Sequence, residues 1–262
     1  MSRRRLRVFV MLDGPSVPAW VHRILLDLAD SEVAELAGAH FVAGSAARTP
    51  LRGLAFRAYQ RLDQRVFGAP GDPLSPVDAS AVLTRAGTAA TPADARADVV
   101  LKLTSAPLPA DWVVTAPLEV WRFDHLECQG RGGVPFFWEM QRGLPVTETC
   151  LRAHTDAGSR ILVRSGAATD PTSLTRGRHA PLWGAAGFVA RALRDAANGG
   201  GAAIVDAGSA AAGPEREPGP LELARFLAST GLRVARARVR GRTHEECWMV
   251  ALRPSRGSLV EG

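Results

Sequence analysis

The chain has 262 residues, of which 46% are hydrophobic and 22% charged, a composition that suits a protein with a sizeable core. No run approaches the roughly 20 apolar residues that a membrane span needs, and no cleaved leader is recognisable, so we expect a cytoplasmic protein. The three cysteines lie far apart without a Cys-x-x-Cys pair, which argues against a disulfide scaffold and a sulfur-rich zinc site. The net charge of +6 comes almost entirely from arginine, since Lys102 is the only lysine; it permits anionic ligands or nucleic acid without indicating either.

The N-terminal part predicts strands that alternate with helices. Residues 6–12 are apolar enough for a central strand, and the following turn leads into a helix that Ser16 caps and whose first turn holds Pro18. A second strand is expected at 38–44 and a helix at 50–67. The residues of that helix expected near one face are Leu51, Leu54, Tyr59 and Leu62.

The middle of the chain continues this pattern. The proline- and glycine-rich stretch 68–80 predicts a loop, and the β-branched run 97–105 predicts a buried parallel strand. Residues 120–125 are expected to form a strand that is followed by a loop over 126–133 and a helix over 134–142.

The C-terminal part predicts a hairpin and then a smaller unit. Residues 146–154 and 160–168 alternate like two paired strands, and 181–197 has helical spacing. Beyond these we expect strands at 202–205, 233–242 and 246–253, a linker at 213–220 and a helix at 221–230. The fold class is therefore α/β: a Rossmann-like, mostly parallel sheet with flanking helices over 1–204, and a short α+β extension over 205–262.

A histidine stands at the end of a predicted strand in the stretch "VWRFDHLECQGRGGVPFFWE", residues 120–139. The carboxyl end of a parallel strand is where α/β proteins commonly keep their sites. The order strand, polar loop, helix and hairpin lets His125 and Asp156 meet across adjacent strand ends. The simpler alternatives stay open: His125 as a structural histidine, Asp156 as a turn residue and Arg131 as a solvated loop residue.

These motifs resemble the catalytic segment of folate-dependent formyltransferases. The resemblance is nearer to the formyltransferase-like N-terminal domain of proteins related to glucosamine inositolphosphorylceramide transferases, whose patterns include "WxFHHGD", "RGGPPGFWE", "D.GRVL" and "TDxxS". The matching positions here are Trp121, Phe123, His125, Arg131, Gly132, Gly133, Pro135, Phe137, Trp138, Glu139, Asp156, Gly158, Arg160, Thr169, Asp170 and Ser173.

The resemblance implies an enzyme that transfers a formyl group from 10-formyltetrahydrofolate to an amine, such as an amino sugar or its conjugate. It implies that His125, Asp156 and the adjacent Asp124 form the catalytic group, with no metal. Arg131, Gly132, Gly133 and Asp13 would then contact the cofactor or shape its pocket. The reaction passes through an oxyanion, which an amide and an imidazole stabilise in the family.

A second hypothesis is a catalytically degraded domain that binds or scaffolds a glycosyl-transferring partner. The family has an asparagine two residues before its histidine, and this chain has Phe123 there. A nucleic-acid role is not favoured: Arg236, Arg238, Arg240 and Arg242 alternate without interleaved aromatic residues, and little chain follows the main domain to form a tRNA-binding unit. The acceptor amine and the oligomeric state stay undetermined at this level.

Overall fold

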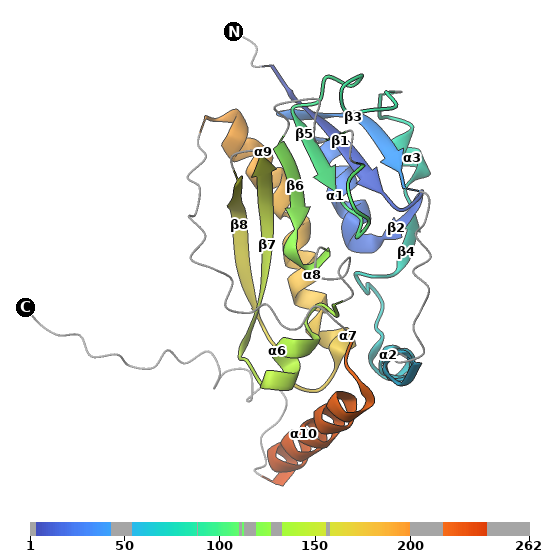
Figure 1. Ribbon diagram of the computed structural model, residues 1–262, viewed down its shortest axis with the longest axis vertical. Coiled ribbons are helices and arrows are strands. Elements are labelled where there is room, and N and C mark those ends of the chain that lie inside the picture. Colours follow the sequence, from blue (N-terminus) through green and yellow to red (C-terminus); the bar gives the residue numbers. More distant parts are fainter. Residues whose placement is uncertain are drawn as a thin grey trace, which may run out of the picture.

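A six-stranded mixed sheet forms the centre of the computed structural model, which describes residues 4–42, 54–87, 89–109, 112, 119–126, 133–155, 158–199 and 217–239. In spatial order its strands are β3 (Ala34–Phe41), β1 (Leu6–Leu12), β5 (Val99–Lys102), β6 (Glu119–Phe123), β7 (Val146–Thr155) and β8 (Gly158–Ala168). The first four are parallel, whereas β7 runs antiparallel to β6 and β8 antiparallel to β7 (Figure 1). The expected α/β class with a mostly parallel sheet is confirmed.

Apolar residues on both faces explain why β1 lies inside the sheet. Val8, Val10 and Leu12 face the larger core, which also contains residues of helices α1 (Ala19–Ala29), α8 (His179–Ala186) and α9 (Phe188–Ala197). The alternate residues Phe9 and Met11 join a second, smaller core with Trp112. A strand that is buried on both faces reads as a continuous hydrophobic run, as this one does in the sequence.

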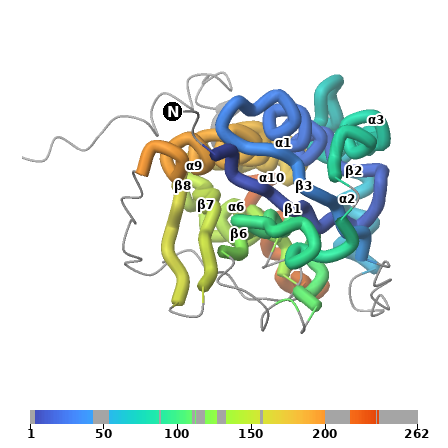
Figure 2. The backbone as a smooth tube through the Cα atoms, turned by 90° about the horizontal axis from the view of Figure 1, so that it is seen from above, coloured from blue at the N-terminus to red at the C-terminus, as the bar shows by residue number. Residues whose placement is uncertain are grey.

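Several helices gather at the end of the molecule toward which β1, β5 and β6 point (Figure 1). They are α2 (Leu54–Phe67), α6 (Phe137–Arg142), α7 (Leu174–Gly177) and α10 (Pro220–Val239). Phe226 of α10 is fully buried, with its ring 5.6 Å from Tyr59 on α2 and 5.1 Å from Phe137 on α6. Helix α10 therefore packs against α2 and α6. In the view from above it is largely hidden behind the rest of the domain (Figure 2).

Two sequence predictions near the N-terminus are wrong in detail. Ser16 does not cap a helix, because Ser16–Pro18 forms a short strand, β2, that pairs with β4 (Pro76–Asp78) inside the expected loop. Helix α1 begins at Ala19 with Pro18 at its N-cap and no side-chain cap. In α2 the buried residues are Phe56 and Asp63, while Leu54 and Leu62 are exposed; residue 51 lies outside the described residues.

Further corrections concern element boundaries. The loop 68–80 also ends in a short helix, α3 (Ser80–Leu83). Strand β6 ends at Phe123, and residues 124–126, where the strand was expected to continue, are helical. The helix expected at 134–142 begins at Phe137, and 181–197 forms parts of two helices, α8 and α9. The expected strand at 233–242 is helical through Val239, because a segment rich in alanine and arginine has high helix propensity and α10 continues into it. Residues 202–205 and 246–253, and the boundary at 204/205, lie outside the described residues.

Within the described residues, no helix is long and apolar enough to cross a membrane.

Replacing Phe226 tests how firmly α10 is attached. We expect Phe226→Ala to lower the free energy of unfolding by about 3–5 kcal/mol, because the change leaves a cavity between α2, α6 and α10. The matched control is Leu227→Ala, whose side chain is 48% exposed and whose loss should cost under about 1 kcal/mol. Urea unfolding followed by circular dichroism measures both, and equal losses would contradict the packing described for α10.

Candidate functional site

His125 lies just beyond the end of β6 in a box of aromatic rings. Its ring centroid is 5.1 Å from that of Trp20 on α1, 5.4 Å from Phe123 and 5.7 Å from Phe136. The residue is 9% exposed, and neither ring nitrogen has a hydrogen-bond partner. A buried polar atom without a partner costs about 1–3 kcal/mol and is uncommon in folded proteins. The sequence predicted the position of this histidine, at a strand end, but not its enclosure.

Burial determines the protonation state of this imidazole. Desolvation lowers the pKa of His125 from 6.5 to about 3, so the ring is neutral at any physiological pH. A neutral imidazole carries one N–H donor and one acceptor nitrogen. It can therefore donate a hydrogen bond to an oxyanion or accept one from an incoming group, but it does not act as an imidazolium acid.

Phe136 closes this box with a strained backbone. Its φ of 69° lies in the left-handed region, which costs a residue other than glycine on the order of 1–2 kcal/mol. The position corresponds to the sixth residue of the family pattern "RGGPPGFWE", which is glycine. Strain beside an unpartnered buried group is a recognised sign of a functional location. The sequence offered this signal in the phenylalanine that replaces a motif glycine.

Trp138 and Glu139 of the same motif lie on α6. Trp138 is 5% exposed with its ring 5.1 Å from that of Phe137, in agreement with a core role. Glu139 is partly buried, and desolvation raises the pKa of its carboxyl above the usual value. The motif helix therefore contributes mainly to packing at this end of the sheet.

Asp124 makes no hydrogen bond to His125, whose ring nitrogens have no partner. Its two carboxylate oxygens accept hydrogen bonds from Nε of Arg152 at 2.8 and 2.9 Å, across the antiparallel pair formed by β6 and β7. Arg152 is the register partner of Arg122, which lies on the face of the sheet opposite Phe123 and Trp20. Asp124 is thus held as an ion-pair partner, and a catalytic role for it receives no support from this geometry.

Asp13 and Thr104 lie at the same edge of the sheet as His125. Asp13 follows β1 and Thr104 follows β5, and these strands are neighbours in the order β1, β5, β6. Thr104 is buried and donates a hydrogen bond from Oγ1 to the exposed Asp13 carboxylate. The Asp13 carboxylate is therefore a hydrogen-bond acceptor at the same carboxyl edge of the sheet as His125. Sequence reasoning named Asp13 but missed Thr104, which has no motif around it.

The remaining predicted site residues are mostly outside the described residues. This holds for Asp156, Arg131 and Gly132, whereas Gly133 is described and buried. In the register of β6 and β7, His154 lies opposite Val120, near the amino end of β6, and His125 lies beyond the carboxyl end. The described strands therefore do not bring the end of β7 toward His125, and the pairing of His125 with Asp156 stays a prediction.

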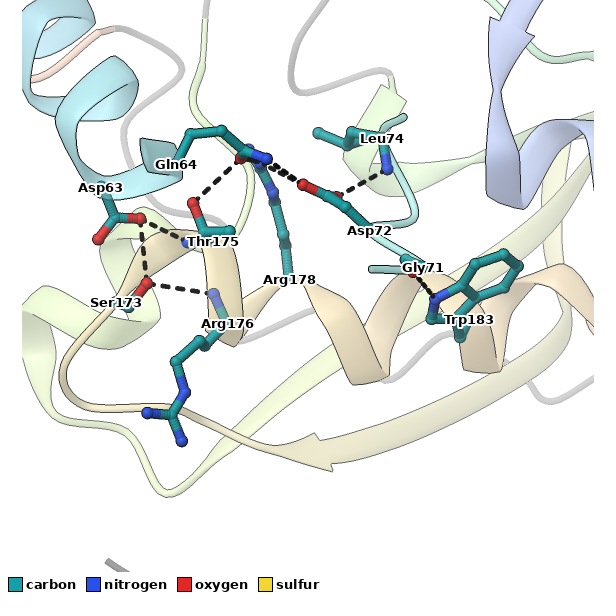
Figure 3. A network of polar contacts seen from close by, with 10 residues as sticks. All are labelled: Asp63, Gln64, Gly71, Asp72, Leu74, Ser173, Thr175, Arg176, Arg178 and Trp183. Atoms are coloured by element: carbon teal, nitrogen blue, oxygen red, sulfur yellow. Dashed lines mark hydrogen bonds and ion pairs between the residues drawn. The ribbon is translucent and has the colours of Figure 1, made fainter. Parts of the chain in front are cut away.

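A second polar cluster joins α2, the loop before β4 and the segment that contains α7 (Figure 3). Asp63 accepts hydrogen bonds from Ser173 Oγ at 3.0 Å and from the Thr175 amide at 2.7 Å. Gln64 contacts both Asp72 and Arg178, and Arg178 lies 3.5 Å from the Asp72 carboxylate. These contacts connect parts of the chain more than 100 residues apart. They account for the burial of Asp63 on α2, which no motif in the sequence indicated.

Asp170 and Ser173, the "TDxxS" positions of the motif, organise the start of α7. Asp170 Oδ1 accepts bonds from the amides of Thr172 and Ser173 at 2.7 and 3.1 Å, and its Oδ2 lies 3.1 Å from Nε of Arg176. Ser173 caps the helix by accepting from the Arg176 amide at 3.2 Å. The carboxylate is thus fully engaged, which indicates a structural role.

A pocket of about 250 Å³ opens beside this cluster. It is lined by Phe67, Ala69, Asp72, Asp170, Thr175, Arg176, His179 and Ala180. Among the described residues there is no group of three or more histidine, cysteine, aspartate or glutamate side chains that could hold a metal ion.

Comparisons with known proteins give similarities of fold only. No family model matches the sequence, and no curated protein does. Among solved structures, a variant of HypX from Aquifex aeolicus matches at 10% identity over 75% of this chain and 28% of that chain, with a TM-score of 0.36. Formyltetrahydrofolate deformylase from Burkholderia mallei matches at 13% identity over 76% and 67%, with a TM-score of 0.42.

The corresponding deformylase from Pseudomonas putida matches at 10% identity, over 73% of this chain and 65% of that chain, with a TM-score of 0.35. The matched part of this chain spans less than a third of the length of the HypX structure named above. No conclusion about activity follows from identities and TM-scores of this size.

The enclosure of His125 predicts a pH-dependent stability. The unfolded chain binds a proton at this residue below about pH 6.5, whereas the folded chain does so only near pH 3, so stability is lost as the pH falls between these values. Relative to His125→Phe, we expect the wild type to lose up to about 1.4 kcal/mol for each pH unit in that window. Urea unfolding at pH 7.5, 5.5 and 4.5 measures the difference; parallel curves for the two proteins would refute the enclosure.

The left-handed backbone of Phe136 predicts that glycine is a more stable replacement than alanine there, the reverse of the order expected in a helix. We expect Phe136→Gly to be more stable than Phe136→Ala by about 1 kcal/mol, because only glycine adopts a positive φ without cost. At the neighbouring Phe137, which begins α6, alanine should be the better replacement by about 0.5–1 kcal/mol. Chemical denaturation of the four variants provides the comparison, and the same order at both positions would contradict the left-handed conformation.

Proposed function

We propose that this protein binds a formylated reduced folate at the carboxyl edge of its parallel strands and transfers the formyl group to an amine. The observation that carries the proposal is His125, a buried neutral imidazole whose two ring nitrogens have no partner at the end of β6. Its position agrees with the motif resemblance of residues 120–139, in which this histidine is the reactive one. The solved structures of similar fold include two named formyltetrahydrofolate deformylases, which makes a formylated folate the first ligand to try.

The proposed chemistry requires little of the protein beyond a hydrogen-bond donor. The amine nitrogen attacks the formyl carbon of 10-formyltetrahydrofolate, and the carbonyl oxygen becomes an oxyanion. The neutral His125 ring donates its N–H to this oxygen, which is the role that suits an imidazole of low pKa. The bond from the formyl carbon to N10 then breaks, N10 takes up a proton, the amine loses one, and tetrahydrofolate and a formamide leave.

The acceptor is proposed to be an amino sugar or its conjugate. This part of the proposal rests on the nearer motif resemblance, to domains that accompany sugar-transferring enzymes. Asp13, at the end of β1 two strands away from β6, is exposed and presents a carboxylate on which an ammonium or hydroxyl group can be held. The reaction itself requires that the attacking amine be unprotonated.

Ligand binding and turnover are tested separately. Titration calorimetry with 5-formyltetrahydrofolate, a stable analogue, should give saturable binding to the wild type. With 10-formyltetrahydrofolate and glucosamine, His125→Gln should lower the rate of tetrahydrofolate release by about 100- to 1,000-fold, the usual cost of one oxyanion donor. His22→Gln, on helix α1 and away from the aromatic box, is the matched control and should keep the wild-type rate. Absence of folate binding at millimolar concentration would remove the proposal.

A specific observation favours a second candidate function. Phe123 occupies the position of the family asparagine and is fully buried against Trp20 and Phe188, so it offers no hydrogen bond to an oxyanion. The alternative is a non-catalytic domain that keeps the fold and supports a glycosyl-transferring partner. Saturable folate binding without any His125-dependent turnover would favour this alternative over the enzyme.

A further inference from the structure

Helix α2 presents an apolar face to solvent. The helix faces the rest of the domain with its buried residues, Phe56 and Asp63. Residues four apart lie on one side of a helix, and an apolar series with this spacing runs along a different side of α2 from these two. We call this series the outer face of α2; its members, all exposed, are Leu54, Ala58, Leu62 and Val66. Figure 1 shows α2 at an outer edge of the molecule.

The exposure of the outer face sets α2 apart from the other elements. Leu54 is 56% exposed, and Leu62 and Val66 are each 62% exposed. More of the exposed large apolar side chains lie on α2 than on any other element that the structure describes. Single exposed apolar residues are common on soluble proteins, whereas a run of them rimmed by polar groups marks a surface that binds a partner or a membrane.

The exposed charges of α2 are all positive. Arg61 and Arg65 are exposed, and neither forms an ion pair within the part of the chain that the structure describes. Each follows a member of the outer face by three residues, so the two arginines lie along one flank of that face. The only acidic residue of the helix, Asp63, is buried and accepts hydrogen bonds from Ser173 and Thr175. The charge of this surface therefore suits an anionic counterpart.

The residue types of the outer face favour a lipid surface over a protein. Protein interfaces gain most of their binding energy from tryptophan, tyrosine and arginine anchors in well-packed pockets, and leucine and valine are under-represented among such anchors. The outer face itself holds only leucine, alanine and valine. A lipid surface needs no pocket, because apolar side chains enter the boundary between headgroups and acyl chains while arginines stay with the phosphates.

A second copy of the chain is a poor occupant for an electrostatic reason. In a two-fold dimer the same patch meets itself. Docking through the outer face would bring Arg61 and Arg65 close to their equivalents in the other copy, and like charges that meet at an interface weaken it.

We propose that α2 is an interfacial helix that binds the surface of an anionic lipid bilayer. Leu54, Leu62 and Val66 enter the headgroup region, and Arg61 and Arg65 lie beside the lipid phosphates. Binding of this kind holds the protein on the membrane surface without a spanning segment. It is independent of the proposed formyl transfer, because the outer face contains none of the residues assigned to that reaction.

Sedimentation with lipid vesicles tests the proposal on the full-length protein. Vesicles of equal parts phosphatidylcholine and phosphatidylglycerol should sediment the wild type, and vesicles of phosphatidylcholine alone should do so at least about 10-fold more weakly. Leu62→Ser and Val66→Ser should each lower the partition coefficient about 10-fold, because each removes an apolar side chain that enters the bilayer. Arg61→Gln and Arg65→Gln should each lower it about 5-fold, the usual effect of one basic residue near an anionic surface.

Two controls separate the outer face from the general properties of the protein. Val146→Ser removes a side chain of similar exposure, 43%, at the start of β7 and should bind like the wild type. Arg191→Gln on α9 removes an arginine whose side chain is 68% exposed, so it changes the net charge as much as Arg61→Gln does and should have no effect of that size. Substitutions at exposed positions such as these should leave the unfolding midpoint nearly unchanged.

Several results would overturn the proposal. They are the absence of sedimentation with anionic vesicles, equal sedimentation with both kinds of vesicle, and wild-type binding by both Leu62→Ser and Val66→Ser. Sedimentation velocity without lipid gives a further test: a wild-type dimer that Leu62→Ser dissociates would show that the outer face binds a second copy instead. If Leu62→Ser does not fold, Leu62→Ala takes its place.

Discussion

Side chains of a strand alternate between the two faces of a sheet, and along β6 this alternation decides what each face can do. Trp121 and Phe123 enter the large core, and Phe123 forms the apolar surroundings of His125 together with Trp20 and Phe136. Arg122 is directed to the other face, where it is the register partner of Arg152, and Arg152 pairs with Asp124 just beyond the end of β6. A slip of one residue in the register would exchange the two sets and bury charge in the aromatic core. The short strand β6 thus separates the aromatic surroundings of His125 from the charged side chains around Arg152 and Asp124.

The sheet changes from parallel to antiparallel pairing at β6, and this change sets where β7 lies relative to His125. Helix α6, between β6 and β7, is only six residues long, whereas a parallel crossover takes a dozen or more residues to return to the amino edge of the sheet. Strand β7 therefore starts at the carboxyl edge and runs away from His125. What lies around His125 at that edge comes from α1, α6 and the strand ends, and not from the described end of the β7–β8 hairpin.

Sequence reasoning predicted the strands well where hydrophobicity alone decides them. The buried runs at β1 and β5 and the alternating hairpin β7–β8 are examples, since each pattern has one dominant reading. It failed where tertiary contacts override the local pattern: Ser16–Pro18 pairs with β4 instead of capping a helix, and the alternating arginines near 236 continue α10. The position of His125 was predictable from its place after a strand. The enclosure of its side chain was not predictable, because Phe136 lies more than 10 residues later in the chain and Trp20 more than 100 residues earlier.

The last strand of the sheet, β8, is a long edge strand. Strand β8 spans 11 residues and has β7 on one side, while no other described strand pairs with its outer side. An edge strand of this length invites the addition of a strand from another molecule. This edge strand carries Arg160 and Arg164, whose side chains are 34% and 31% exposed. Arg160 pairs with Glu119 of β6, and Arg164 lies near Glu148 of β7. Charged residues on an edge strand oppose such pairing, so we expect these arginines to disfavour edge-to-edge association of separate copies of the chain at high concentration.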